Sequence, residues 1–347
     1  LPEDKGPAGT VLRRAKALAE HLEKAGADSQ KLSVLKADLE KLATAWTKEK
    51  STDEQKAKAY YYTACALRRQ LAFLNPLLNF DDVLVAARGT FEGSIRSLPR
   101  TNDGVGGHMS NQYFGFNTIP AGGLFVFKNW RGTPQVVDLL KDAVVQNGRW
   151  QGKKLENGSV ATPDLSFDGK KIAFAWSANQ AHNLNRYAQD NTFHIFTINA
   201  DGTDLRQLTD GTEGDFDPCF LPSGRIAFIS ERRGGHIRCF ASYLRVRNYT
   251  LFDMEQDGSD IRPLSYFETS EWNPSVNNDG MIVYSRWDYV DRENCIGGRF
   301  WIAGPDGTNP RAPHGNYPRP FSTIDAKQAQ QQFEKEFPGI PWQGWGS

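Results

Sequence analysis

The chain has 347 residues, and its 41 Lys and Arg residues balance its 41 Asp and Glu residues. With no net charge to attract polyanions, nucleic acid and anionic membrane surfaces are not expected as partners. No apolar run approaches the ~20 residues that cross a bilayer, so the sequence predicts no membrane span.

Residues 1–78 are predicted to form an α-helical arm. Residues 1–5 lack the basic and apolar regions of a signal peptide, which fits a mature secreted protein or a chain whose signal has been removed. Apolar residues keep helical spacing as far as Gly26, and a second such run extends from Leu32 to Trp46. Residues 51–54 (STDE) resemble a capping box that opens a third helix, and Pro76 ends it. The arm either packs against the rest of the chain or contacts an oligomer partner.

Strands are expected from residue 80 onward, first at 82–87 and 123–128, and one pattern then occurs three times. SFDGKKIAFAW (166–176), LPSGRIAFIS (221–230) and NNDGMIVYSRW (277–287) resemble one another, and Gly169, Gly224 and Gly280 lie 55 and 56 residues apart. A second marker follows each pattern: DGTDLR at 201–206, DGSDIR at 257–262 and DGTNPR at 306–311. A repeat of this length that contains strands is typical of a β-propeller.

The predicted fold is therefore mainly β: a β-propeller at residues 79–320, after the helical arm and before a polar tail at 321–347. About four blades are visible, and the three better-defined ones cover about 161–210, 211–267 and 268–316. Propellers close with about four to eight blades, and an unclosed ring leaves unpaired strand edges. Either the ring is small, or further blades come from another protein chain or from a missing C-terminal portion.

Residues 80–316 resemble the propeller domain in the middle of the hydrazine synthase alpha subunit and its haem-free, TolB-like and WD40-like relatives. The phrases that carry the resemblance are HMSNQYFG (108–115), DPCFLPSGRIAF (217–228), EWNPSV (271–276) and YSRWDYVDR (284–292). The resemblance implies an extracytoplasmic location, periplasmic or secreted, and a six- or seven-bladed ring. It does not imply hydrazine chemistry, because that activity depends on c-type haems and this chain has no CxxCH attachment motif.

Charged residues recur near the starts of successive predicted blades, and arginines follow the apolar strands. Carboxylates and guanidinium groups around a channel can bind a sugar acid, with Trp and Tyr as stacking faces. The same groups can instead pair with each other and lock blade to blade, and both interpretations stay open. The candidates for ligand binding are Gln112, Asp217, Glu271, Trp287 and Arg292, and those for catalysis are His108, Tyr113, Arg232, Arg286 and Asp288.

The histidines lack the close spacing of a helical or hairpin metal site. His108, in a Gly-rich loop beside Gln112 and Tyr113, is the best single candidate for a general base or a metal ligand. His108, His236 and His314 would hold a divalent metal if the ring brought them together, as in some propeller-shaped polysaccharide lyases. The alternative is three unrelated surface or capping histidines. A divalent metal at these histidines is the one cofactor expectation, since the chain has no c-type haem motif.

The four cysteines include no CxxC pair, so a zinc ribbon is not expected. Cys239 and Cys295 occupy comparable loops of adjacent predicted blades, where an oxidising compartment would allow a disulfide, and a metal-binding thiol is the alternative. Cys219 and Cys65 are expected to pack in the core.

Three classes of function remain open. The first is a binding or scaffold module within a larger extracytoplasmic assembly. The second is a carbohydrate-active enzyme, similar to a lyase on uronic-acid glycans, in which His108, Tyr113 and the arginines meet in one cavity with a glycan bound. The third is a redox or metal subunit of the hydrazine synthase kind.

Overall fold

The structure is a computed structural model of the chain, and it describes residues 4, 6–49, 53–87, 122–178, 192–236, 247–287, 298–313, 330–331 and 334–335. The chain forms two compact units. The first comprises Leu1–Asp82, Asn129–Pro134 and Gln330–Ser347, and the second comprises Val83–Lys128 and Gln135–Ala329. The domain boundaries expected from the sequence stay predictions.

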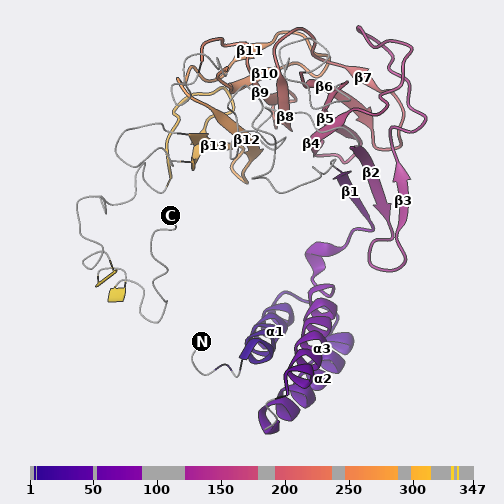
Figure 1. The fold of residues 1–347 in the computed structure, drawn as a ribbon, viewed down its shortest axis with the longest axis vertical. Coiled ribbons are helices and arrows are strands. Elements are labelled where there is room, and N and C mark those ends of the chain that lie inside the picture. Colours follow the sequence, from indigo (N-terminus) through magenta and orange to yellow (C-terminus); the bar gives the residue numbers. More distant parts are fainter. Residues whose placement is uncertain are drawn as a thin grey trace. The chain divides into compact units, whose positions relative to one another are not determined.

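Three α-helices lie side by side in the described part of the first unit: α1 (Gly6–Lys24), α2 (Ser29–Lys48) and α3 (Glu54–Ala72) (Figure 1). A short 3₁₀ helix, η1 (Pro76–Leu78), follows them. The Asp28 carboxylate accepts hydrogen bonds from the first free N–H groups of α2, and Asp53 does the same for α3. The expected capping box at residues 51–54 was therefore wrong in register, because α3 begins at Glu54 and its cap is Asp53. The core of this unit is an apolar stripe on α1 packed against α2 and α3, with Ala8, Ala15, Leu22, Leu32, Leu39, Trp46 and Leu71 buried.

The described part of the second unit contains four antiparallel sheets that resemble propeller blades. The first consists of β1 (Asp82–Ala87), β2 (Gly123–Lys128) and β3 (Gln135–Asp138). The second consists of β4 (Ser159–Leu165), β5 (Lys171–Ser177), β6 (His194–Asn199) and β7 (Arg206–Gln207). The third consists of β8 (Asp215–Phe220), β9 (Ile226–Ser230), β10 (Thr250–Met254) and β11 (Arg262–Pro263). The fourth consists of β12 (Glu271–Val276), β13 (Ile282–Trp287) and β14 (Gly298–Ala303).

The repeat seen in the sequence corresponds to the second, third and fourth sheets. Gly169, Gly224 and Gly280 form the turns between the first two strands of each sheet, all with φ between 71° and 88°. This left-handed conformation is favourable for glycine, which has no Cβ. The expectation of blade-like repeats after a helical arm is thus confirmed at the level of the sheets.

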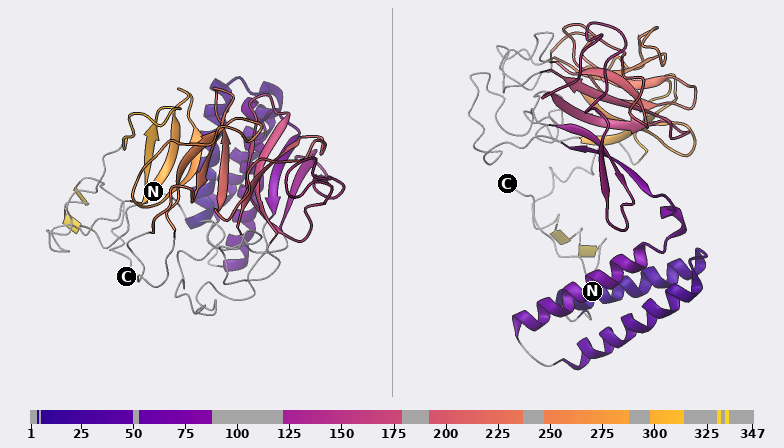
Figure 2. Two further views of the ribbon diagram at one scale, coloured as in Figure 1. Left: turned by 90° about the horizontal axis from the view of Figure 1, so that it is seen from above. Right: turned by 90° about the vertical axis from the view of Figure 1, so that its right-hand side faces the viewer.

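Each of the first three sheets packs against the first strand of the next. Strands β4, β8 and β12 are neighbours, and β5 and β6 also contact β8, while β9 and β10 contact β12. Figure 2 shows these sheets standing beside one another in two further views. One core cluster extends through the second, third and fourth sheets and includes Phe216, Ile229, Leu251, Trp272 and Tyr284.

Candidate functional site

The first strand of each repeated sheet bulges at the same place, where a polar residue precedes a proline. Thr162, Asp217 and Asn273 all have positive φ, at 35°, 51° and 52°, although none is glycine. The pairing register with the second strand shifts at each of them. Because a bulge leaves one residue outside the ladder, its backbone N–H needs another partner.

That partner belongs to the preceding sheet. The N–H of Asp217 donates to Thr162 Oγ1 at 3.2 Å, and the N–H of Asn273 donates to Asp217 Oδ2 at 2.9 Å. Asp217 is only 4% exposed. The aspartate predicted to bind a ligand is therefore placed inside the protein, where it joins the third sheet to the fourth.

Glu271 and Arg286, at opposed positions of β12 and β13, form a buried ion pair. Glu271 Oε1 accepts from Arg286 Nη2 at 2.8 Å and from Ser265 Oγ at 2.9 Å, and its Oε2 accepts from the N–H of Leu251 at 3.0 Å. Burial raises the pKa of Glu271 above its ordinary value, and Arg286 opposes this effect. Because Leu251 belongs to β10, the pair also connects the third and fourth sheets.

Aromatic rings enclose the Arg286 guanidinium. Its carbon lies 4.0 Å from the ring centre of Phe267 and 4.0 Å from that of Trp301. Flat cation–π contacts of this kind suit the planar guanidinium. A cavity of about 310 Å³ adjoins it, lined by Leu264, Tyr266 and Pro310 among others. Trp287, the predicted stacking residue, is itself 7% exposed.

Arg232 is held by a buried carboxylate. Its Nη2 donates to Asp215 Oδ2 at 2.7 Å and its Nε to Asp215 Oδ1 at 3.2 Å. The carbonyl of Asp210 accepts from the same Nη2 at 3.1 Å. This fork geometry fixes Arg232 in one orientation, with part of its side chain open to a cleft.

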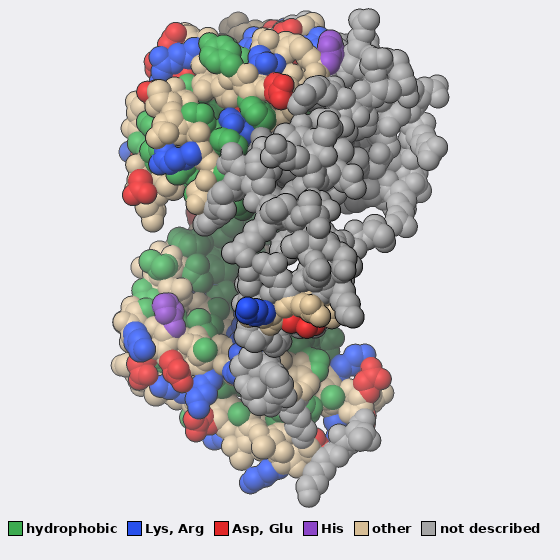
Figure 3. Space-filling view, turned by 90° about the vertical axis from the view of Figure 1, so that its left-hand side faces the viewer, with side chains coloured by type: hydrophobic (Ala, Val, Ile, Leu, Met, Phe, Trp, Pro, Cys, Tyr) green, Lys and Arg blue, Asp and Glu red, His purple; other side chains and the backbone are tan. Residues whose placement is uncertain are grey.

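Besides the Glu271–Arg286 pair, described residues predicted for a site also meet at that polar cleft, of about 500 Å³. Arg232 and His236 line it together with Glu213, Glu231 and Arg247. Arg247 lies 3.7 Å from Glu213 and 3.6 Å from Glu231, so charges of both signs compensate each other. Figure 3 shows basic and acidic side chains interspersed on one face of the molecule. Among its described residues, the cleft therefore has no surplus of cations for an acidic ligand.

The remaining predicted site residues lie outside the described residues. Within the described ranges, no group of three His, Cys, Asp or Glu side chains is arranged to hold a metal ion. Cys65 and Cys219 are free thiols, and burial raises the pKa of Cys219 to about 12. The residues not described are His108, Gln112, Tyr113, Cys239, Asp288, Arg292, Cys295 and His314. The proposed disulfide therefore stays a prediction, and so does the three-histidine site, of which only His236 is described.

One further feature, an apolar face of the fourth sheet, has no signal in the sequence. Ser285 and Phe300 are paired across β13 and β14, as are Val283 and Ile302, so these four side chains share a face. We call it the open face. Phe300 is 67% exposed and the other three are partly exposed.

The equivalent positions of the second and third sheets are covered. Ile195 in β6 and Leu251 in β10 take the place of Phe300, opposite Ala175 and Ile229, and they are 0% and 1% exposed. The difference arises because β8 and β12 cover those faces. A solvent-facing aromatic at a position that is core in the second and third sheets distinguishes the open face from those two sheets.

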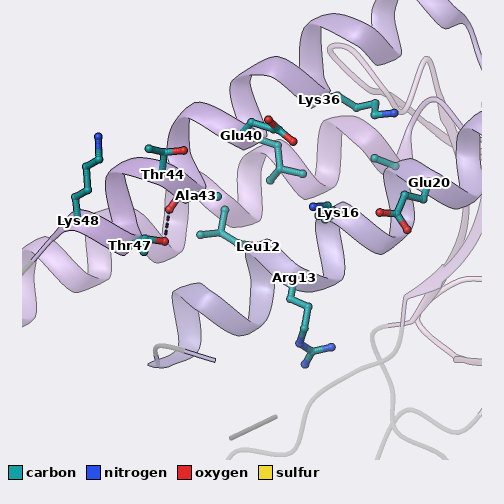
Figure 4. Close-up of a pocket in the computed structure, with 12 residues that line it drawn as sticks. Leu12, Arg13, Lys16, Glu20, Lys36, Glu40, Ala43, Thr44, Thr47 and Lys48 are labelled. Carbon is teal, nitrogen blue, oxygen red and sulfur yellow. Dashed lines mark hydrogen bonds between the residues drawn. The ribbon is translucent and has the colours of Figure 1, made fainter. Parts of the chain in front are cut away.

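The helical unit has a separate groove of about 690 Å³ between α1 and α2 (Figure 4). Apolar side chains such as Leu12 and Leu39 line it, and charged side chains of both signs surround it. Two of its cations are already paired, Arg13 with Asp4 and Lys36 with Glu23. In the described part of the chain, no helix is long and apolar enough to cross a membrane.

No protein-family model matches the chain, and no curated protein matches it. Among solved structures, hydrazine synthase of Kuenenia stuttgartiensis is similar with a TM-score of 0.47 and 17% identity over 68% of this chain. The putative TolB of Agrobacterium tumefaciens has a TM-score of 0.37 and 18% identity over 56% of this chain. An oligogalacturonate lyase in complex with manganese has a TM-score of 0.36 and 13% identity over 68%.

The chain spans 32%, 59% and 50% of these three proteins, respectively. The expected resemblance to hydrazine synthase and TolB is thus present as a distant similarity of structure to β-propeller proteins. It assigns no activity to this chain.

Proposed function

We propose that the chain is a binding and scaffold module of a larger extracytoplasmic assembly and that it joins this assembly through the open face. The observation that carries the proposal is the exposure of Phe300, 67%, at a position where Ile195 and Leu251 are 0% and 1% exposed. The charged residues predicted for a ligand site support the same function, because Asp217, Glu271 and Arg286 are occupied in holding sheets together.

The location outside the cytoplasm is part of this proposal and rests on the sequence resemblance at residues 271–276 and 284–292. The lyase-like alternative needs His108 and Tyr113 to reach the cleft of Arg232 and His236. Since the described charges of that cleft compensate each other, no specific observation favours this second function.

The test uses Phe300→Glu, with Phe167→Glu as the matched control. Phe167 lies in the turn after β4 and is 70% exposed, so both substitutions place a charge on an exposed ring position. Burying a phenylalanine is worth about 1.5–3 kcal/mol, so loss of the Phe300 contact is expected to weaken assembly by one to two orders of magnitude.

The measurement is the native mass of each protein isolated from its own host, with thermal unfolding to verify that the variants fold. Wild type and Phe167→Glu are expected in a complex heavier than the 38.9 kDa chain, and Phe300→Glu as the free chain. A wild-type protein found only at the mass of the free chain would overturn the proposal. So would a Phe300→Glu variant that stays fully assembled.

A further inference from the structure

We propose that the open face binds a further blade of the same repeat, carried by a separate polypeptide, whose first strand donates a backbone N–H to the side-chain oxygen of Asn273. This inference rests on the proposed function, because it names the partner of the same face. The contacts that support it occur between the second and third sheets, occur again between the third and fourth, and have their next member at the open face.

The first repeated contact is the hydrogen bond at the bulge. Thr162 accepts from the N–H of Asp217, and Asp217 accepts from the N–H of Asn273. Asn273 has the same left-handed backbone and the same following proline, but among the described residues its side chain has no hydrogen-bond partner. The side-chain oxygen of Asn273 is therefore the next acceptor of the series, and it has no donor among the described residues.

The second repeated contact joins backbones. The N–H of Asp215 donates to the carbonyl of Phe193 at 2.8 Å, and the N–H of Glu271 donates to the carbonyl of Tyr249 at 2.9 Å. In both cases the first residue of a first strand binds the residue just before the third strand of the preceding sheet. At each interface, this backbone bond and the bulge bond together fix the position and the register of the incoming strand.

The third repeated contact is apolar. Phe216 and Trp272, each directly before a bulge residue, belong to the same core cluster as Ala175, Ile229 and Leu251. First strands thus bring a large side chain to the middle of the preceding sheet. On the fourth sheet, Phe300 and Ser285 are the corresponding positions, and Phe300 is 67% exposed while Ser285 is partly exposed.

These contacts define the occupant by its chemistry. Its first strand needs an apolar residue, then a small polar residue, then proline, and a glycine turn completes the pattern. In this chain a Ser, Thr, Asp or Asn followed by proline has a glycine seven positions later only at Thr162, Asp217 and Asn273.

All three of these strands are already the first strands of described sheets. A second copy of residues 1–347 therefore has no such strand left to offer, and the proposal assigns the donor strand to the partner in the assembly. This continuity with two existing interfaces favours a further blade over an unrelated partner.

The test replaces Phe300 by the photo-crosslinker p-benzoylphenylalanine in the protein's own host, and the crosslinked peptide is identified by mass spectrometry. The expected peptide comes from another polypeptide and carries the apolar–polar–proline sequence with glycine seven positions after the polar residue. A crosslink to residues 1–347 of a second copy, or to a peptide without this pattern, overturns the inference but leaves the proposed function intact. Absence of any crosslinked partner, with free wild-type chain, contradicts both.

Asn273→Leu and Asn273→Asp test the acceptor directly. Loss of one hydrogen bond that leaves a buried N–H unpaired is expected to weaken partner retention about tenfold in Asn273→Leu, whereas Asn273→Asp keeps an acceptor oxygen and most of the binding. Ser275→Leu, on the exposed side of the same strand, is the matched control and is expected to bind like wild type. Equal retention by Asn273→Leu and Ser275→Leu would show that Asn273 does not set the register.

Discussion

At the scale of single residues, the charged side chains near the sheet ends stabilise the fold by pairing with groups inside the protein. Each carboxylate has its donors inside the protein: Asp215 has Arg232, Asp217 has the N–H of Asn273, and Glu271 has Arg286. A buried carboxylate without such donors would lower the free energy of unfolding by several kcal/mol. Removal of either partner of such a pair is therefore expected to destabilise the fold.

Truncating Arg286 should therefore destabilise the chain strongly. Arg286→Ala leaves Glu271 buried and unpaired, and the expected loss of unfolding free energy is about 3–5 kcal/mol in urea titrations. Arg286→Lys should recover only part of it, because an ammonium cannot lie flat between Phe267 and Trp301. Arg233→Ala is the control, since Arg233 makes one long bond to the Gly234 carbonyl at 3.5 Å and should change stability by less than about 0.5 kcal/mol. A loss below about 1 kcal/mol for Arg286→Ala would contradict the structural role.

The sequence could not decide between a structural and a ligand-binding carboxylate. Residue type and strand position are the same for both, and the difference lies in which donor the neighbouring sheet supplies. Glu271, for example, takes a hydrogen bond from Leu251, twenty residues away in the chain, and nothing local encodes that contact.

At the scale of elements, the Asp-Gly turns of the repeat are built identically. Oδ1 of Asp201 accepts from the N–H and the hydroxyl of Thr203, and Asp257 and Asp306 bind Ser259 and Thr308 in the same way. These turns and their glycines were predictable, because the residues that determine them are adjacent in sequence.

The open face was not predictable for the opposite reason. Apolar residues lie on both sides of Val283, and Phe300 is followed directly by Trp301, so no alternation marks which face of the sheet is covered. Whether Val283 and Phe300 are covered depends on a neighbouring sheet that the local sequence does not show. The predicted start of α3 was wrong by less than one helical turn. Thr, Ser and Asp are all good N-cap residues, but only Asp53 is followed directly by the helix.

The aspartates of the Asp-Gly turns should make the free energy of unfolding decrease at acidic pH. Hydrogen bonds from Ser259 lower the pKa of Asp257 below its ordinary value of 3.8, so its ionised form is favoured in the folded state. The stability it contributes is full above that unfolded value and is lost as pH falls through the lower, folded pKa. Wild type should therefore exceed Asp257→Asn in unfolding free energy by a constant amount above about pH 5, and the gap should shrink below about pH 4.

Urea titrations at several pH values measure this gap. Ser259→Ala, which removes the hydroxyl donor but keeps the carboxylate, should reduce the same pH-dependent difference. A gap that stays constant down to about pH 2.5 would mean that the turn does not favour the ionised form.

At the scale of the whole second unit, the sheets form a series in which each interface repeats the one before it. In such repeats stability is approximately the sum of the units and of their nearest-neighbour interfaces. An end sheet then lacks one interface, and the positions that would fill it contribute little until a partner arrives.

The same substitution at three equivalent positions tests this description. Ile195→Ala and Leu251→Ala remove fully covered side chains and should each cost about 2–5 kcal/mol of unfolding free energy in the isolated chain. Phe300→Ala, at the matching position of β14, should cost less than about 0.5 kcal/mol, because its ring already faces solvent. In the assembled complex the Phe300→Ala cost should rise toward that of the other two, since the ring is then covered. If Phe300→Ala is as costly as Leu251→Ala in the isolated chain, the chain itself covers this face in solution, and the open face is not the place where the assembly forms.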